Sequence, residues 1–215
     1  MDGFEIDTAI PLEEVFFARD TIAVARDLLG SVLVSTADGL VTAGRIVETE
    51  AYLGADDPGS HAATKGITKR NRVMYGPPGR AYVYFTYGNH YMLNVVTEPD
   101  GVAGAVLIRA VEPLAGEAVM ARRRGRGVSL TDGPGKLAQA FGVDLSDNGV
   151  PLNAGQLAIY RGVTPVSGIA ESGRVGLSTG HELQLRFYVN GNVHISKAQT
   201  GPRANVRRGQ GRKDT

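Results

Sequence analysis

The stretch RAYVYFTYGNHYMLNVVT (80–97) decides the fold. Two runs rich in tyrosine, phenylalanine and valine, residues 80–87 and 91–97, flank the pair Gly88-Asn89. Aromatic and β-branched runs of this length are typical of strands. Glycine at the first central position suits a tight two-residue turn. The stretch therefore predicts a β-hairpin.

Working outward from this hairpin, the chain alternates apolar runs with turn signals. The further strands expected are 31–36, 40–50, 105–110, 156–160, 184–189 and 193–196. The helices expected are 20–29, 114–124 and 136–141, and residues 55–79 are expected to form a loop. Most of these strands are joined by turns rather than by crossover helices. We therefore predict an α+β fold, a single domain with a curved, largely antiparallel β-sheet, surrounding helices and a protruding hairpin.

The bulk composition is that of a globular protein. Of 215 residues, 42% are hydrophobic and 21% are charged. The apolar runs are far shorter than the roughly 18–20 residues of a membrane span, and the acidic N-terminus lacks the layout of a signal peptide. With no cysteine, the chain has no disulfide, no thiolate metal site and no cysteine nucleophile. We expect a cytoplasmic protein with one domain over residues 1–199 and a flexible basic tail over 200–215.

A net charge of +1 hides an uneven distribution of charge along the chain. Residues 1–62 carry twelve acidic and three basic residues, whereas residues 63–215 carry twenty basic and ten acidic ones. Such a division favours one face that meets a polyanion, although charges also cluster by chance.

One carboxylate stands out at the end of an apolar strand pattern. Glu50 follows Glu48 and precedes Tyr52 by two residues, so the alternation of a strand places all three on one face. A carboxylate that faces an aromatic ring at a strand end can act as a general base toward water, as in glycoside hydrolysis. The spacing by itself favours a solvated edge residue over this catalytic interpretation.

Aromatic residues crowd around the hairpin. Six of the fourteen aromatics, five of them tyrosines, lie within the 17 residues from Tyr75 to Tyr91. Tyrosine rings are good platforms for stacked bases, and interleaved basic residues add phosphate contacts. A tyrosine-rich hairpin packed within the sheet explains the crowding equally well. The interleaved basic residues are Lys65, Lys69, Arg70, Arg72 and Arg80.

Two further features concern ligands. His61 has no second histidine or aspartate at ligand spacing, so we predict no metal and no cofactor. The stretch Gly133-Pro134-Gly135-Lys136 can present backbone N–H groups and a lysine to a phosphate at a helix start. It lacks the P-loop pattern, so nucleotide binding is not indicated.

Several motifs, taken in order, resemble the alkyladenine (3-methyladenine) DNA glycosylases over residues 12–198. The matching motifs are RIVETEAYLG (45–54), His61, NRVMYGPPGRAYVYFTYG (71–88), Asn94, LIRAVEPLAG (107–116), GPGKL (133–137) and LRFYV (185–189). The hairpin tip departs from the pattern. It reads Gly-Asn-His-Tyr, where the mammalian members carry bulkier apolar residues.

The resemblance implies a catalytic pair. Glu50 is similar to the general base that deprotonates the attacking water, and Arg109 is similar to the arginine that holds this water. The main chain at Val175 is similar to a third water contact. Tyr52 and Tyr84 resemble the rings that take the flipped base between them.

The remaining positions implied by the resemblance bind the base or the duplex. His61 is similar to a hydrogen-bonding partner of the base, and Asn94 to the asparagine that crowds the 2-amino group of guanine. Tyr87 resembles a wedge residue that enters the minor groove and fills the gap left by the flipped nucleotide. We further predict that the duplex is contacted by Gly88, Asn89, His90, Arg72 and Lys136.

The expected activity is that of a monofunctional, monomeric base-excision-repair glycosylase acting on double-stranded DNA. Its substrates would be 3-methyladenine, 7-methylguanine, hypoxanthine and ethenoadenine, and its product an abasic site without a strand break. Cationic alkylated purines leave easily and suit electron-rich tyrosine rings. Two alternatives remain: a non-catalytic protein that recognises damaged DNA, and a small-molecule hydrolase or transferase that shares only the fold.

Overall fold

The computed structural model describes residues 9–86, 88–163 and 165–197. The helices are α1 (Glu14–Phe17), α2 (Thr21–Asp27), α3 (His61–Lys65), α4 (Glu117–Arg124) and α5 (Pro134–Phe141), with 3₁₀ turns η2 (Ala37–Gly39), η3 (Arg72–Tyr75) and η4 (Leu145–Asp147). The strands are β1 (Val32–Ser35), β2 (Thr42–Tyr52), β3 (Ala81–Thr86), β4 (His90–Val96), β5 (Ala105–Ala115), β6 (Leu157–Tyr160), β7 (Ile169–Ser172) and β8 (Arg186–Val189).

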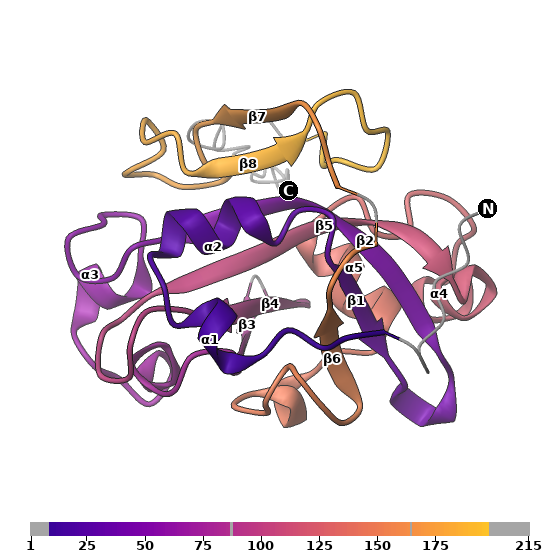
Figure 1. Ribbon diagram of the computed structural model, residues 1–215, viewed down its shortest axis with the longest axis horizontal. Coiled ribbons are helices and arrows are strands. Elements are labelled where there is room, and N and C mark those ends of the chain that lie inside the picture. Colours follow the sequence, from indigo (N-terminus) through magenta and orange to yellow (C-terminus); the bar gives the residue numbers. More distant parts are fainter. Residues whose placement is uncertain (1–8, 87, 164, 198–215) are drawn as a thin grey trace, which may run out of the picture.

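These strands form one curled antiparallel sheet, which confirms the predicted α+β single-domain fold. The order β3-β4-β5-β2-β1-β6 runs across it, and β8 pairs with both β2 and β7. The β7–β8 hairpin lies along one edge of the molecule (Figure 1). The predicted hairpin is formed by β3 and β4, whose register runs from Ala81↔Val95 to Thr86↔His90.

The long strands β2 and β5 form the centre of the sheet. They pair along nearly their whole length, and the other edge of β2 is shared between β1 and then β8. Between the pairs Ile46↔Val111 and Thr49↔Ile108 the register shifts twice, so that Val47 on β2 and Arg109 on β5 have no direct partner. Such bulges re-aim side chains and are common next to active sites.

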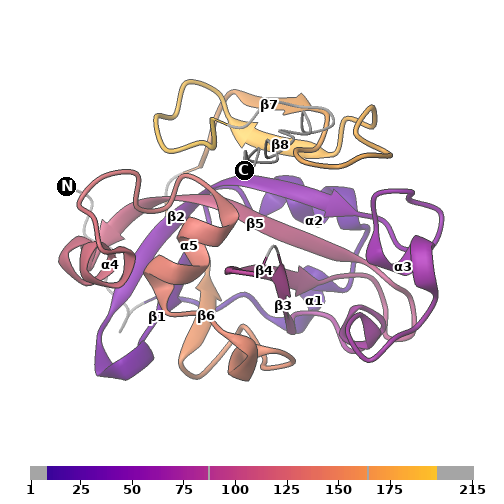
Figure 2. The ribbon, with the colours of Figure 1, turned by 180° about the vertical axis from the view of Figure 1, so that it is seen from behind.

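Helices cover both faces of this strand pair. Helix α2 packs on β2, whereas α5 packs on β4 and β5 from the opposite face (Figures 1 and 2). As predicted, the carboxylate of Asp20 caps α2 by accepting from the Ala23 N–H at 2.9 Å. Pro134 at the start of α5 needs no hydrogen-bond partner for its nitrogen, which suits a first helical turn. The apolar faces of both helices are buried in the main core.

Four expectations about elements need correction. Strand β5 continues to Ala115, so α4 begins at Glu117 rather than at Leu114, after Gly116 in the left-handed conformation. The segment 55–79 contains α3 and η3. Strand β7 was not expected. Residues 193–196 form no strand, because the Asn192 side chain accepts from the His194 N–H and the Ser196 N–H donates to Glu48.

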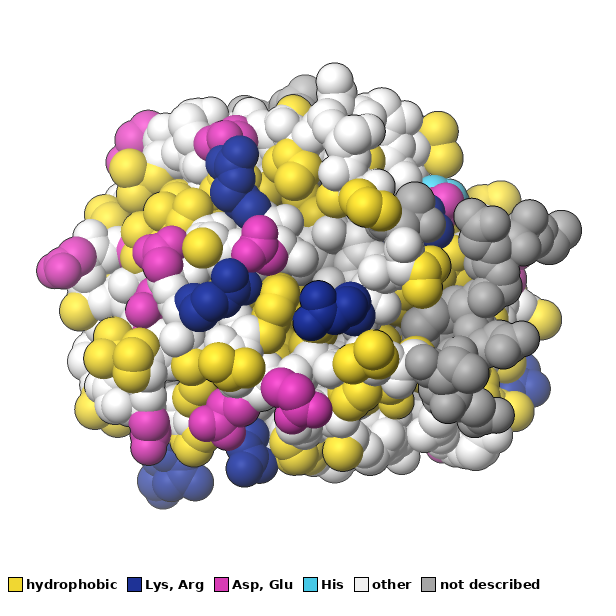
Figure 3. Space-filling model, in the orientation of Figure 1, with side chains coloured by type: hydrophobic (Ala, Val, Ile, Leu, Met, Phe, Trp, Pro, Cys, Tyr) yellow, Lys and Arg dark blue, Asp and Glu magenta, His cyan; other side chains and the backbone are white. Residues whose placement is uncertain are grey.

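Charged side chains of both signs alternate over the face that carries α2 (Figure 3). On this face no large area of one sign is present among the described residues. Within the described parts of the chain, no helix is long and apolar enough to cross a membrane.

Candidate active site

A cavity of about 490 Å³ opens where β2, β3, β4 and β5 converge with α3 and α5. Its wall contains six residues to which the sequence assigned a catalytic or base-binding role, and they lie up to 123 positions apart in the chain. They are Tyr52, His61, Tyr84, Asn94, Arg109 and Val175. Apolar side chains from η3, β4 and β5 also line the cavity, namely Met74, Met92, Ala105 and Leu107.

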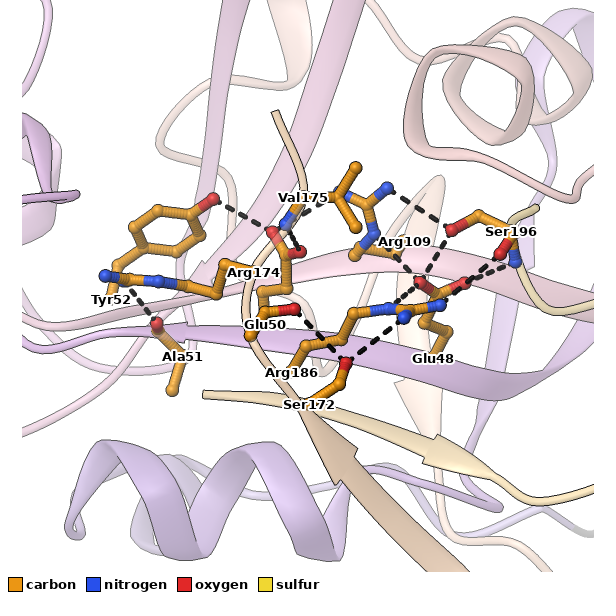
Figure 4. Close-up of polar contacts among 11 residues, drawn as sticks. Glu48, Glu50, Ala51, Tyr52, Arg109, Ser172, Arg174, Val175, Arg186 and Ser196 are labelled. Carbon is orange, nitrogen blue, oxygen red and sulfur yellow. Dashed lines mark hydrogen bonds and ion pairs between the residues drawn. The ribbon is translucent and has the colours of Figure 1, made fainter. Parts of the chain in front are cut away.

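Glu50 lies directly behind this wall and is fully buried. Its Oε1 accepts from the Val175 N–H at 2.8 Å, and its Oε2 accepts from the Tyr52 hydroxyl at 2.9 Å. The Arg109 Nη1 lies 3.3 Å from the same Oε2. Val175, Tyr52 and Arg109 all line the cavity, and Figure 4 shows their contacts with the Glu50 carboxylate. The interpretation of Glu50 as a solvated edge residue is therefore wrong.

Glu48, two residues earlier, is the centre of a second and denser network (Figure 4). Its Oε1 accepts from Arg109 Nε at 3.0 Å, Arg186 Nε at 2.6 Å and the Ser196 hydroxyl at 2.7 Å. Its Oε2 accepts from the Ser196 N–H at 2.6 Å. Arg109 thus bridges the two carboxylates, as the bulge at its position allows, and the alternation predicted for Glu48, Glu50 and Tyr52 is confirmed.

This arrangement fixes the charge states of the site. Burial tends to raise the pKa of Glu48, but Arg109, Arg186 and the Ser196 hydrogen bonds outweigh it, so the pKa lies below its usual value. Burial lowers the pKa of Arg109, but the negative charges of Glu50 and Glu48 outweigh burial and raise this pKa above its usual value. Burial and the charge of Glu50 raise the pKa of Tyr52 well above its usual value, so its hydroxyl remains a donor.

His61 is held at the cavity by its own loop. It opens α3, which the Ser60 hydroxyl caps, and its main-chain carbonyl accepts from the side-chain amide of Asn71 at 3.0 Å. Its Nδ1 lies 3.0 Å from the Tyr82 hydroxyl, and its ring meets Tyr84 edge-on with the centroids 4.8 Å apart. Burial raises the pKa of Tyr82 to about 12.

Comparison with known proteins decides the family. A sequence model of methylpurine-DNA glycosylase matches residues 15–193. Proteins provisionally named 3-methyladenine DNA glycosylase are 46% identical over 192 residues in Methanoculleus marisnigri and 47% identical over 194 residues in Chlorobium phaeobacteroides. These alignments cover 86% and 88% of this chain, and 98% and 97% of the two relatives.

The chain belongs to the methylpurine-DNA glycosylase family. A relative from Carboxydothermus hydrogenoformans is 47% identical over 191 residues, with 86% of this chain and 98% of the relative covered. The protein is therefore a DNA glycosylase, and DNA is its substrate. The family resemblance drawn from the motifs is confirmed.

The described residues that were predicted to contact the duplex lie on the β3–β4 hairpin, at the start of α5 and on η3. Lys136 lines the cavity and pairs with Asp132 at 3.1 Å. Gly88 and Asn89 are exposed at the β3–β4 turn, and His90 packs against Gly135 at the start of α5. Arg72 is exposed on η3. Tyr87 lies outside the described residues.

The sequence did not single out four residues that shape this site. Arg186 and Ser196 complete the network of Glu48, and Arg174 forms a buried pair with Asp57 beside Tyr52. An arginine inside the apolar run LRFYV was the one usable signal, because a charge there needs a buried partner. Within the described parts of the glycosylase, no three histidine, aspartate or glutamate residues are grouped as a metal site.

Proposed function

We propose that this glycosylase removes alkylated and deaminated purines from duplex DNA by means of a water molecule activated by Glu50. Its substrates would be 3-methyladenine, 7-methylguanine, hypoxanthine and ethenoadenine. The product would be an abasic site with an intact strand.

The proposal rests on the number of hydrogen bonds that each buried carboxylate accepts, which is larger for Glu48 than for Glu50. An ionised carboxylate offers about four acceptor positions. Glu48 accepts four hydrogen bonds from protein groups, three at Oε1 and one at Oε2. Glu50 accepts from Val175 and Tyr52 and is approached by Arg109, which leaves it about one position. Because Val175, Tyr52 and Arg109 lie in the cavity wall, we infer that this position is taken by a water molecule held beside a bound nucleotide.

The proposed reaction follows from this arrangement. The water oxygen bonds to C1′ of the sugar, its proton passes to Glu50, and the N-glycosidic bond breaks with its electron pair on the purine. A cationic alkylated purine thereby leaves as a neutral base. The negative charge of Glu50 also stabilises the developing positive charge of the sugar.

The cavity wall supports recognition of a flipped base. Tyr52 and Tyr84 offer aromatic faces, to which a cationic purine is attracted through the ring quadrupole. His61 and Asn94 supply hydrogen-bonding groups in the same cavity. Flipping costs less for a damaged or mispaired base, which adds selectivity. The Asn94 amide is oriented by donation from its Nδ2 to the Tyr82 carbonyl at 2.9 Å.

The duplex would be held by the hairpin and by basic residues around the cavity. In this proposal Tyr87 wedges into the minor groove, while Arg72 and Lys136 contact phosphates. Strand β3, which leads to the hairpin turn, carries Tyr82 and Tyr84 in the cavity wall. We further expect a cytoplasmic enzyme that acts as a monomer.

The decisive experiment is single-turnover release of 3-methyladenine and of hypoxanthine from duplex DNA. Loss of a general base should slow release by about 10²–10⁴-fold in Glu50→Gln. Glu112→Gln is the matched control, since Glu112 is a partly buried carboxylate paired with Arg45 and does not line the cavity. Equal release by wild type and Glu50→Gln would remove Glu50 from the mechanism.

A second assay tests whether water or an amine attacks the sugar. Lys136 and Lys197 line the cavity, so an amine nucleophile is within the site. The Lys136 amine is paired with the carboxylate of Asp132 at 3.1 Å. We expect no strand cleavage and no covalent enzyme–DNA adduct on treatment with borohydride. An adduct that disappears in Lys136→Gln or Lys197→Gln would replace the water mechanism.

A further inference from the structure

Arg174 is a completely buried arginine next to the site, and its contacts are unusually many. Its two terminal nitrogens donate to both oxygens of Asp57. The same nitrogens donate to the carbonyls of Ala51 at 2.9 Å and Gly180 at 3.1 Å. Arg174 thereby joins three segments: the end of β2, the loop before α3, and the residues that follow β7.

The contacts of Arg174 lie next to the proposed general base, Glu50, and next to two of its hydrogen-bond donors, Tyr52 and Val175. Ala51, which accepts from its guanidinium, lies between Glu50 and Tyr52 in the sequence. The guanidinium stacks on the ring of Tyr52, with its central carbon 4.7 Å from the ring centroid. The next residue is Val175, whose N–H donates to Glu50 (Figure 4). The Arg174 side chain therefore contacts Ala51 and Tyr52, which follow Glu50 in β2, and its backbone leads directly to the N–H that Glu50 accepts.

The guanidinium of Arg174 is closely packed by its surroundings. A Cβ at Gly59 would lie 2.5 Å from its Nη2, and a Cβ at Gly180 would lie 3.0 Å from the same atom. Asp57 is equally constrained, because it also accepts from the N–H groups of Leu53 and Gly59. The guanidinium is thus enclosed by the backbone of Gly59 and Gly180, the carboxylate of Asp57 and the ring of Tyr52.

Stability alone does not account for this buried pair. The desolvation of two charges offsets most of their attraction, and a well-packed apolar pair is often as stable. The Nε of Arg174 also has no hydrogen-bond partner among the described residues, which adds a cost. The planar guanidinium of Arg174 donates to two carboxylate oxygens and two carbonyls at once, and an apolar pair cannot do this.

We propose that Arg174, with Asp57, is a positioning residue of the glycosylase reaction. It holds the Val175 N–H against Glu50 and supports Tyr52 from the ring face that Arg174 covers. It does not line the cavity, so it acts through these neighbours and not on the DNA itself. The inference rests on the proposed function of Glu50 and adds the residue that sets the geometry of the site.

The proposal predicts a division between the chemical step and DNA binding. Small misplacements of reacting groups cost up to about a hundredfold in rate. In Arg174→Lys, the single-turnover rate constant for hypoxanthine release should fall between about tenfold and a hundredfold. The dissociation constant for a duplex with an abasic-site analogue should be unchanged. A merely structural role would lower the folded fraction and leave the rate of each folded molecule at the wild-type value.

Two further variants keep the experiment decisive. Asp57→Asn/Arg174→Met removes both charges, keeps an acceptor for the loop N–H groups, and leaves no unpaired buried charge. Arg123→Lys is the matched control, since Arg123 also donates to two main-chain carbonyls, those of Ala37 and Ala140, far from the cavity. Rates are normalised to the folded fraction from thermal unfolding.

Each result of these measurements either supports or overturns the positioning role of Arg174. A slower chemical step in both Arg174 variants, with unchanged DNA affinity and a normal rate in Arg123→Lys, supports the positioning role. Wild-type rates in the folded variants overturn it, and so does failure of both Arg174 variants to fold, because the pair then serves the fold alone. If Glu50→Gln is active, the proposed function fails first. If Glu50→Gln is inactive while Arg174→Lys is fully active, only this inference fails.

Discussion

Two glutamates separated by a single residue have different environments in this glycosylase. Both are completely buried, and both are bound by Arg109. Glu48 receives two arginines and Ser196, whereas Glu50 receives Arg109 and neutral donors. Glu48 therefore compensates the positive charges, and Glu50 retains acceptor capacity next to the cavity.

The first prediction concerns Glu48→Gln. Loss of this carboxylate leaves Arg109 and Arg186 buried with Glu50 as the one remaining negative charge in the network, so we expect the free energy of unfolding to fall by about 3–5 kcal/mol. Urea denaturation measures it. Glu112→Gln breaks a partly exposed pair and should cost less than about 1 kcal/mol. Similar losses in the two variants would contradict the account of Glu48.

The second prediction concerns acid. Glu48 and Asp57 have pKa values below the ordinary 4.5 and 3.8, so the unfolded chain binds protons before the folded one does. Their contribution to stability is complete above those ordinary values and is lost as the pH falls through the lowered folded values. Thermal unfolding from neutral pH down to about pH 3 measures this loss. The loss of stability on acidification should be smaller in Glu48→Gln than in the wild type. If the stability of both proteins falls equally with pH, Glu48 is not a source of this loss.

At the scale of elements, a pair of bulges and an irregular segment build the site. Val47 and Arg109 interrupt the β2–β5 pairing, which brings Arg109 to both glutamates. The segment 193–197 then closes the network from the other side, because Ser196 bonds to Glu48 through both its N–H and its hydroxyl. The carboxylate of Glu48 thus joins the β2–β5 strand pair to the irregular segment 193–197.

The third prediction tests this segment with Ser196→Ala. The change removes the hydroxyl that donates to Glu48 and accepts from Arg109 Nη2 at 3.3 Å. Hydrogen bonds to charged groups contribute about 1.5–3 kcal/mol, so stability should fall by that amount. Base release should also slow, because Arg109 loses one of its anchors.

Ser35→Ala provides the comparison for Ser196→Ala. Ser35 is a buried serine whose hydroxyl donates to the Phe141 carbonyl at 2.7 Å, and it does not line the cavity. It should lower stability without changing the rate of base release by the folded enzyme. If both variants release base at the wild-type rate, Ser196 serves the fold and not the reaction.

Local signals in the sequence were sufficient for some elements and insufficient for others. The hairpin 80–97 and the helix capped by Asp20 were predictable because glycine, asparagine and aspartate act on their immediate neighbours. Strand alternation likewise placed Glu50 beside Tyr52. The pairing of Ser196 with Glu48 spans 148 positions, and no local pattern encodes it. For the same reason residues 193–196 resembled a strand, although the N–H groups of His194 and Ser196 bond to side chains.

At the scale of the whole molecule, buried ion pairs explain part of the uneven distribution of charge along the chain. Three acidic residues of the first 62 are buried and compensated by arginines from the later part of the chain. The acids are Glu48, Glu50 and Asp57, and the arginines are Arg109, Arg174 and Arg186. The acidic start and the basic remainder are therefore folded against one another at the site. Surface charge for DNA must come from other basic residues.

The last prediction concerns residues 200–215, which carry five basic residues and one acidic residue. If this tail contacts phosphates, each contact releases counterions and adds about 0.9 to the slope of log affinity against log salt. Removing residues 200–215 should therefore flatten the salt dependence of duplex binding while leaving single-turnover base release at saturating enzyme unchanged. Titrations at several salt concentrations measure the slope. A full-length variant with the five basic residues replaced by glutamine should match the truncated one, since charge and not length is responsible. Equal slopes in all three proteins would show that the DNA is held by the domain alone.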